Sequence, residues 1–219
     1  MESLSIDGEI VQVYGNGDQS ILKQKIGTLK WRKKVNDSCK RVCPVGLAGH
    51  LDNRIRRWIQ NPEKILRPYI EEGMTVLDIG CGPGFFSIEM AKMIGESGRV
   101  IAADLQEGML QKLRKKIKGT ELEKRIILHQ CEKNRIGLSE HVDFVLLFYM
   151  VHEVPDVEGL FNEIETILRT KGRVFVAEPP LHVSKKAFEK TVQKARDAGL
   201  SVVERPHIFF SKTVVLEKG

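Results

Sequence analysis

The sequence lacks the features that mark membrane-spanning, secreted or disulfide-stapled proteins. Its longest unbroken apolar run covers residues 144–151, whereas a helix that crosses a bilayer needs about 20 apolar residues. The first eight residues contain two acidic residues and no basic one, unlike a secretory leader. The four cysteines, Cys39, Cys43, Cys81 and Cys131, form no closely spaced framework, which fits a reducing compartment. We therefore expect a cytoplasmic protein.

Two kinds of ligand site find little support in the sequence. No Gly-Lys-Ser/Thr triplet follows a glycine-rich turn, which excludes a phosphate-cradling P-loop. Cys39, Cys43, His50 and Cys131 are metal-ligating residue types, yet their spacing matches no compact zinc pattern. We therefore expect no metal site, and the sequence assigns no role to Cys39 or Cys43.

The composition is that of an ordinary globular protein with an uneven charge. A length of 219 residues suits one domain, and 42% hydrophobic and 29% charged residues suit a globular chain. Residues 20–60 contain 11 Lys and Arg against 2 Asp and Glu, so they carry more than the net charge of +6. Such a segment either forms a solvated basic surface or attracts an anionic partner such as nucleic acid.

The most informative stretch is residues 75–91, where a strand-like segment, a glycine-rich turn and a helix-like segment follow one another. Apolar residues frame Asp78, and Gly80, Gly82 and Gly84 follow at alternate positions. Glycine permits a tight turn whose backbone N–H groups approach a ligand closely. The helix start behind it adds a partial positive charge. The order predicts a nucleotide-type binding element, although G-x-G-x-G differs from the dinucleotide-binding G-x-G-x-x-G.

Strand-like and helix-like segments alternate along the rest of the chain, which predicts an α/β sheet with helices on both faces. Ligands of such sheets bind at the carboxyl ends of the strands. The expected strands after the first are residues 98–104, 125–130, 142–148 and 173–178, followed by two short ones between 201 and 217.

The run Asp78-Ile79-Gly80-Cys81-Gly82-Pro83-Gly84 closely resembles the signature of class I S-adenosylmethionine-dependent methyltransferases. The resemblance covers about residues 42–219. It implies a Rossmann-like open sheet of seven strands, mostly parallel, with an antiparallel C-terminal hairpin. It also implies S-adenosylmethionine as the methyl donor and S-adenosylhomocysteine as the product. The small-molecule branch, with its quinone-biosynthesis and arsenite methyltransferases, is the most similar, although the cysteine that arsenite enzymes place after the fourth strand is missing here.

The resemblance also implies a set of cofactor-binding residues. In the family, an acid at the tip of the second strand binds the ribose, and this position is Asp104. The same carboxylate is placed to cap the following helix, and both roles are compatible. Glu132 matches the acid near the adenine amino group, and Leu105 or Met109 would cover the adenine. The full implied set is Asp78, Gly80, Cys81, Gly82, Gly84, Asp104, Leu105, Met109, Glu132, Lys133 and Phe148.

Candidates for catalysis and acceptor binding follow from position and residue type. His152 and Tyr149 lie just after the fourth strand, where a family member holds the reacting methyl group. Histidine titrates near neutrality, so His152 is either a general base or a structural residue that packs the next helix. His50, Trp58 and Glu178 are expected to contact the acceptor, with the first two on a helical cover over residues 42–59.

We expect residues 1–40 to be a partly flexible extension with a short strand at 10–14. Residues 41–219 would form the methyltransferase domain, with its helical cover at 41–72. The expected activity is methyl transfer to a small molecule. Two alternatives stay open: an RNA or protein methyltransferase that uses the basic segment 20–60, and a non-catalytic protein that binds S-adenosylmethionine. The sequence does not identify the methyl acceptor.

We predict that the basic segment 20–60 is not a nucleic-acid-binding arm, because it lacks arrayed aromatic side chains on which bases stack. A chain that begins at Lys40 should bind S-adenosylmethionine as tightly as the full chain in calorimetry. Tight and steeply salt-dependent RNA binding by the full chain, lost on truncation, would contradict this prediction and favour the RNA alternative.

Overall fold

The computed structural model describes residues 2–6, 9–13 and 60–219 of the chain. Contacts divide the chain into two compact units, Met1–Lys40 and Arg41–Gly219. The first unit contains an antiparallel hairpin of β1 (Glu2–Ile6) and β2 (Glu9–Val13), with Ile6 opposite Glu9. The expected strand at 10–14 is present as β2. The sequence analysis did not identify β1, although the two residues between the strands, Asp-Gly, favour a tight hairpin turn.

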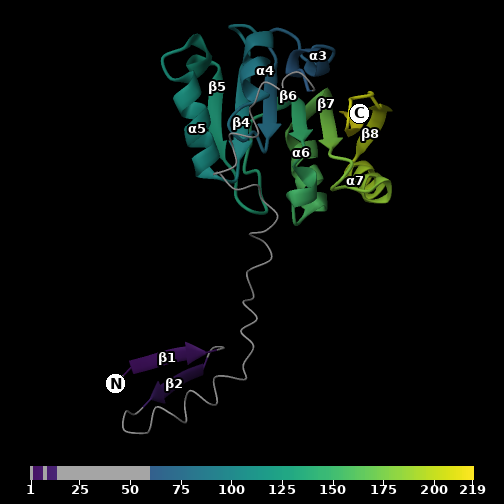
Figure 1. The fold of residues 1–219 in the computed structure, drawn as a ribbon. Helices are drawn as coiled ribbons and strands as arrows, with labels where there is room; N and C mark the ends of the chain where they lie inside the picture. The colour runs from purple at the N-terminus through teal and green to yellow at the C-terminus, as the bar shows by residue number, and fades with distance from the viewer. Residues whose placement is uncertain (1, 7–8, 14–59) are drawn as a thin grey trace. The chain divides into compact units, whose positions relative to one another are not determined.

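The second unit is built on a seven-stranded sheet with the order β5-β4-β3-β6-β7-β9-β8 (Figure 1). Strands β3 to β7 run parallel, and β9 is antiparallel to both of its neighbours. This topology confirms the predicted fold class. The strands are β3 (Thr75–Ile79), β4 (Arg99–Asp104), β5 (Ile126–Gln130), β6 (Val142–Phe148), β7 (Leu168–Glu178), β8 (Leu200–Glu204) and β9 (Lys212–Lys218).

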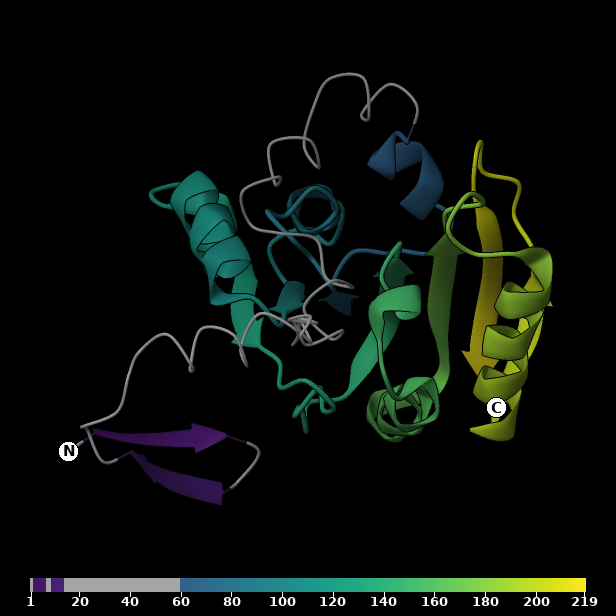
Figure 2. The same ribbon diagram turned by 60° about the horizontal axis from the view of Figure 1, so that its bottom comes forward.

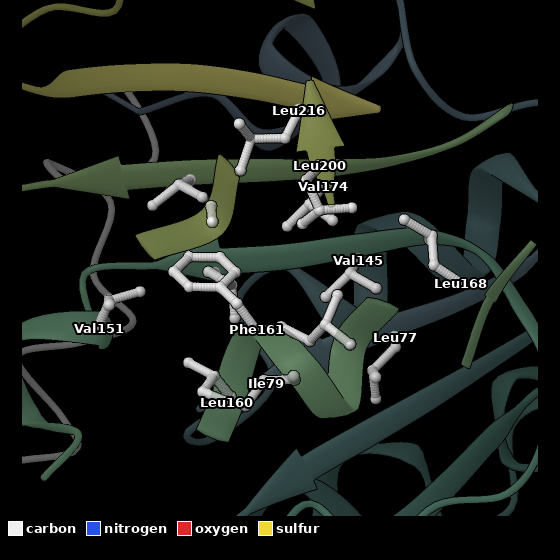
Figure 3. Close-up of a cluster of buried hydrophobic side chains, with 14 of the residues drawn as sticks. Leu77, Ile79, Val145, Val151, Leu160, Phe161, Leu168, Val174, Leu200 and Leu216 are labelled. Carbon is white, nitrogen blue, oxygen red and sulfur yellow. The ribbon is translucent and has the colours of Figure 1, made fainter. Parts of the chain in front are cut away.

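Helices cover both faces of this sheet (Figure 2), and each face has one cluster of buried apolar side chains between the sheet and its helices. Val76 and Leu77 are neighbours in β3 but belong to opposite clusters, because successive strand residues point to opposite faces. Figure 3 shows the cluster in which Phe161, which is fully buried, packs near Leu77 and Val145. The helices are α3 (Pro62–Leu66), α4 (Ser87–Met93), α5 (Glu107–Ile117), α6 (Val157–Ile167) and α7 (Lys185–Asp197), with short 3-10 turns η3 (Glu121–Lys124) and η4 (Val151–Glu153).

Side-chain caps explain where several helices begin. Asn61 accepts a hydrogen bond from the Lys64 backbone at 3.2 Å, with Pro62 as the first helical residue of α3. Ser184 accepts one from the Ala187 backbone at 3.1 Å at the start of α7. Asn and Ser are among the residue types preferred at such positions. No helix among residues 60–219 is long and apolar enough to cross a membrane.

Strand β7 differs from the sequence prediction because it begins at Leu168, before the Thr170-Lys171-Gly172 turn signal. Lys171 adopts a left-handed conformation with φ of 65°. The register against β6 shifts between the pairs Val142–Leu168 and Phe144–Arg173. The turn signal therefore produces a bulge inside a long strand rather than a loop before a short one.

Candidate active site

The glycine-rich loop after β3 adopts a backbone that only glycine accepts easily. Gly80, Gly82 and Gly84 have φ values of 73°, 55° and 85°. A side chain at Gly80 would place its Cβ 2.9 Å from Cβ of Met150, and one at Gly84 would lie 2.3 Å from Cδ1 of Leu113. The loop is therefore packed between the segment that follows β6 and helix α5. Glycine is needed there for space as well as for conformation.

Asp104 at the tip of β4 holds this loop in place. Its Oδ2 accepts a hydrogen bond from the Gly82 backbone N–H at 2.9 Å, and its Oδ1 accepts one from Gln106 at 2.8 Å. Burial raises the pKa of Asp104, and the two backbone hydrogen bonds oppose that rise. A carboxylate offers about four acceptor positions. Asp104 therefore connects the start of α5 to the loop. Its carboxylate keeps acceptor positions with which hydroxyl groups of a ligand would form hydrogen bonds.

Asp78 lies beneath the same loop and connects β3 to α4. Its side chain is buried and accepts a hydrogen bond of 2.5 Å from the hydroxyl of Ser87, the first residue of α4. On the outer side, the Lys116 ammonium donates to the Pro83 carbonyl oxygen at 2.8 Å. The loop is thus anchored at β3, α4 and α5, which gives it a defined shape without any bound ligand.

His152 and Glu178 form a hydrogen-bonded pair across the ends of β6 and β7. Nδ1 of His152 lies 2.5 Å from Oε2 of Glu178, and the His152 backbone N–H donates to Oε1 at 3.2 Å. The Glu178 side chain is only 2% exposed, whereas that of His152 is 26% exposed. The hydrogen bond to Glu178 raises the pKa of His152, against the lowering effect of burial. The carboxylate assigns the proton to Nδ1, so the neutral ring presents Nε2 as an acceptor.

Tyr149 occupies a strained backbone position at the end of β6. Its φ of 61° lies in the left-handed region that an aromatic residue rarely adopts. Its hydroxyl accepts a hydrogen bond from Nε2 of Gln60 at 2.7 Å, and it lies 2.6 Å from Oγ of Ser211 and 3.0 Å from the carbonyl oxygen of Phe210. Its ring lies 4.5 Å from that of Phe148. The Tyr149 hydroxyl therefore joins three segments of the chain.

The remaining predicted site residues are spread around this centre. Leu105 is 40% exposed after β4, whereas Met109 is buried in α5 and Phe148 is buried at the end of β6. Glu132 and Lys133 are exposed after β5, and Glu132 pairs with Arg135 through the backbone. Burial raises the pKa of the Cys81 thiol within the loop. Their cofactor contacts stay predictions.

Other predictions fall on residues that the structure does not describe. These are His50, Trp58, the expected cover at 42–59, and Cys39 with Cys43. Among residues 60–219, no three His, Cys, Asp or Glu side chains gather as a metal site would require.

Sequence reasoning missed the residues that position the predicted ones. Gln60 and Ser211 lie 89 and 62 positions from Tyr149 in the sequence, so no local pattern connects them. Ser87 lies only nine positions from Asp78, and its place as the first residue of the helix was a usable signal. The partnership of His152 with Glu178 required the β6–β7 pairing, because neither residue marks the other in the sequence.

Comparison with known proteins identifies relatives of this chain. A family model described as a methyltransferase domain matches residues 70–206. A demethylmenaquinone methyltransferase of Lactobacillus johnsonii is 30% identical over 162 residues, which cover 72% of this chain and 66% of the relative. A demethylmenaquinone methyltransferase of Lactococcus lactis is 32% identical over 121 residues, 53% of this chain and 48% of the relative. The chain thus spans about half to two thirds of the length of these curated relatives.

One solved structure is also similar over its whole length. It is described as a S-adenosylmethionine-dependent methyltransferase from Aquifex aeolicus, with 26% identity and a TM-score of 0.74. The match covers 81% of this chain and 100% of that one.

We predict that Glu178→Gln lowers the pKa of His152, because a neutral amide no longer stabilises the imidazolium. In an NMR titration the pKa of His152 should exceed 6.5 in the wild type and fall in the variant. Because the pKa of His152 is raised in the folded state, the protonated His152 stabilises the fold. This contribution is complete below the unfolded-state pKa of about 6.5 and is lost as pH rises through the folded-state pKa. His141, exposed before β6, serves as the internal control, and an unchanged pKa of His152 would contradict the assignment.

Proposed function

Because the chain belongs to the class I S-adenosylmethionine-dependent methyltransferase family, we propose that it transfers a methyl group from S-adenosylmethionine to a small-molecule acceptor. The observation that carries the proposal is the hydrogen-bonded pair of His152 and Glu178 at the carboxyl ends of β6 and β7. Met150, two residues before His152, is the side chain against which Gly80 is packed. His152 therefore follows, by two residues, the side chain that packs against the loop that would hold the methyl donor.

The residues of the loop fit this cofactor on structural grounds. Three left-handed glycines let the loop backbone turn tightly and pack closely against Met150 and Leu113, and the loop carries no lysine of a phosphate-binding type. Its Gly80–Gly84 backbone would back the methionine half, and Asp104 would accept hydrogen bonds from the ribose hydroxyls. Glu132 would receive the adenine amino group near Leu105 and Met109. When bound, the cofactor supplies a methyl group already activated on a sulfonium.

We propose that His152 acts as the general base. Its Nε2 would take a proton from the nucleophilic atom of the acceptor, and the electron pair left on that atom would form the bond to the methyl carbon. The bond from that carbon to sulfur would break, and its electron pair would stay on the sulfur of the product S-adenosylhomocysteine. Glu178 holds the ring through Nδ1 and stabilises the imidazolium that results. Phe86, Phe148 and Tyr149 lie in a row of ring contacts of 4.3 and 4.5 Å. Such apolar packing would keep water away from the end of β6.

The acceptor class that fits best is a small aromatic molecule with an ionisable hydroxyl group or a carbon that such a group activates. Tyr149, which is only partly buried, would offer its ring for stacking, and His152 offers a base for the proton. The names of the two bacterial relatives support this class, because they refer to methylation of a quinone.

Two other functions remain as competing proposals. An RNA or protein methyltransferase would use the basic segment 20–60, of which the structure describes only Gln60. A non-catalytic binding protein would keep the loop and use the His152–Glu178 pair only to hold η4 in place. Both differ from the small-molecule proposal in measurable ways.

The first prediction of this proposal concerns Asp104. Asp104→Asn removes the charge and one acceptor oxygen, so S-adenosylmethionine should bind about 10- to 100-fold more weakly in calorimetry, as expected for hydrogen bonds to a charged group. Asp197→Asn, on the exposed side of α7, is the matched control and should bind normally. Unchanged affinity in Asp104→Asn would remove this residue from the cofactor site. Tighter binding of NAD than of S-adenosylmethionine would contradict the cofactor assignment.

The second prediction concerns His152. His152→Gln should reduce single-turnover methyl transfer by roughly 10²- to 10⁴-fold with unchanged cofactor affinity, because only proton removal is lost. The acceptor comes first from a screen of quinols, phenols and RNA, read by release of S-adenosylhomocysteine. His141→Gln, at an exposed histidine before β6, is the control. Full activity in His152→Gln would end the general-base proposal, and binding without turnover on any acceptor would favour the non-catalytic alternative.

A further inference from the structure

Three large apolar side chains protrude from two loops at one edge of the sheet. Leu181 is 80% exposed, Phe209 65% and Phe210 54%. They are the three most exposed large apolar residues in the described part of the chain. We call these three residues the apolar rim. Single exposed apolar residues are common, but a group of this kind at loop tips marks an interaction surface.

The two loops lie side by side at the carboxyl end of β7. Leu181 belongs to the connection from β7 to α7, and Phe209 and Phe210 belong to the connection from β8 to β9. Glu178 pairs with Lys212 at the start of β9, and the Lys212 ammonium donates to the carbonyl oxygen of Pro180 at 3.4 Å. Figure 2 shows both connections at the same end of the sheet.

The rim is held in its exposed position by the hydrogen bonds of its own loop. Phe210 has a left-handed backbone with φ of 58°, and its carbonyl oxygen accepts a hydrogen bond from the Tyr149 hydroxyl at 3.0 Å. The Ser211 backbone N–H closes a turn on Ile208 at 3.2 Å, and Ile208 packs against the core. The chain therefore partly buries Ile208 and turns the two phenylalanines outward, at the cost of an unfavourable backbone conformation at Phe210.

Positive charge surrounds the rim. Residues 179–212 hold seven Lys and Arg against three Asp and Glu, a net charge of +4. Arg205 is paired with Glu189 at 2.8 Å. Lys185 and Lys186 are exposed in the first turn of α7, directly after the loop that carries Leu181. Lys212 adds a third cation beside Pro180. The cations lie on the elements that flank the three apolar side chains.

We propose that the apolar rim is a docking surface for an anionic lipid bilayer. Leu181, Phe209 and Phe210 insert among the acyl chains, and Lys185 and Lys186 contact the headgroups. Three side chains at loop tips are too small a surface for a stable protein interface, which buries about 1,200–2,000 Å² in total. A bilayer requires no complementary shape, and its binding is favoured by protruding apolar side chains that have basic neighbours. This combination favours lipid over a protein partner.

The docking surface would place the candidate active site at the membrane surface. Tyr149 connects the rim to the end of β6, and the ring of His182, next to Leu181, lies 5.9 Å from the ring of His152. An acceptor of low water solubility could then reach His152 without crossing bulk water. The proposal goes beyond the proposed function and does not require it, because lipid binding is measurable without cofactor or acceptor.

The test is co-sedimentation of the full chain with phosphatidylcholine vesicles, with and without phosphatidylglycerol. We expect binding only to the vesicles that contain phosphatidylglycerol. The triple variant Leu181→Ser, Phe209→Ser, Phe210→Asn should lose at least about tenfold in partitioning, because the inserted apolar area is removed. Asn at position 210 accepts the left-handed conformation and preserves the loop. Lys185→Gln and Lys186→Gln should each cost roughly fivefold.

The matched control is Ile127→Ser. Ile127 is 44% exposed on β5, the strand at the opposite edge of the sheet, so its variant should bind vesicles like the wild type. Thermal unfolding and S-adenosylmethionine affinity of all variants confirm that each one folds. Unchanged vesicle binding in the triple variant would overturn the proposal and assign binding to the basic segment 20–60. The proposal would also fail if the full chain did not bind phosphatidylglycerol vesicles. It would fail as well if the wild type self-associated and the triple substitution abolished that self-association rather than vesicle binding.

Discussion

The hydrogen bond from the Gly82 backbone N–H to the Asp104 carboxylate is the constraint on which the candidate site depends. It joins the loop after β3 to the tip of β4, at the point where a ligand of this fold would lie. The loop can adopt its left-handed conformation because its glycines carry no Cβ, and its close packing against Met150 and Leu113 leaves room for nothing larger. Asp104 therefore holds the loop and the start of α5 together through its two backbone hydrogen bonds.

A second buried carboxylate has a comparable role on the other half of the sheet. Glu178 is buried, and an unpaired charge at that depth would be costly. Its two oxygens meet the ring and the backbone of His152, so the charge is compensated and the ring is oriented. Sequence analysis assigned Glu178 to the acceptor and left His152 as either a general base or a structural residue. The geometry brings the two together and favours a role for Glu178 that acts through His152.

Tyr149 shows how a strained residue links distant parts of the chain. Its left-handed backbone directs the phenol toward Gln60 and Ser211, and its hydroxyl donates a hydrogen bond to the carbonyl oxygen of Phe210. The same contact that holds Tyr149 at the end of β6 also holds the loop that exposes Phe209 and Phe210. The candidate site and the apolar rim are therefore mechanically connected through one hydroxyl group. Strain of this kind is typical of functional positions, where surrounding contacts compensate its cost.

The sequence by itself determined the alternation of strands and helices after residue 75 and the glycine-rich loop, because periodicity and turn residues act over a few positions. It also placed Asp78, Asp104 and Glu178 at strand ends. Only the tertiary structure decided which of these side chains meet. Asp104 meets Gly82, and Glu178 meets His152, through strand pairing between segments 22 and 26 positions apart. Tyr149 meets Gln60 across 89 positions. Such contacts depend on packing of the whole sheet, which no local pattern encodes.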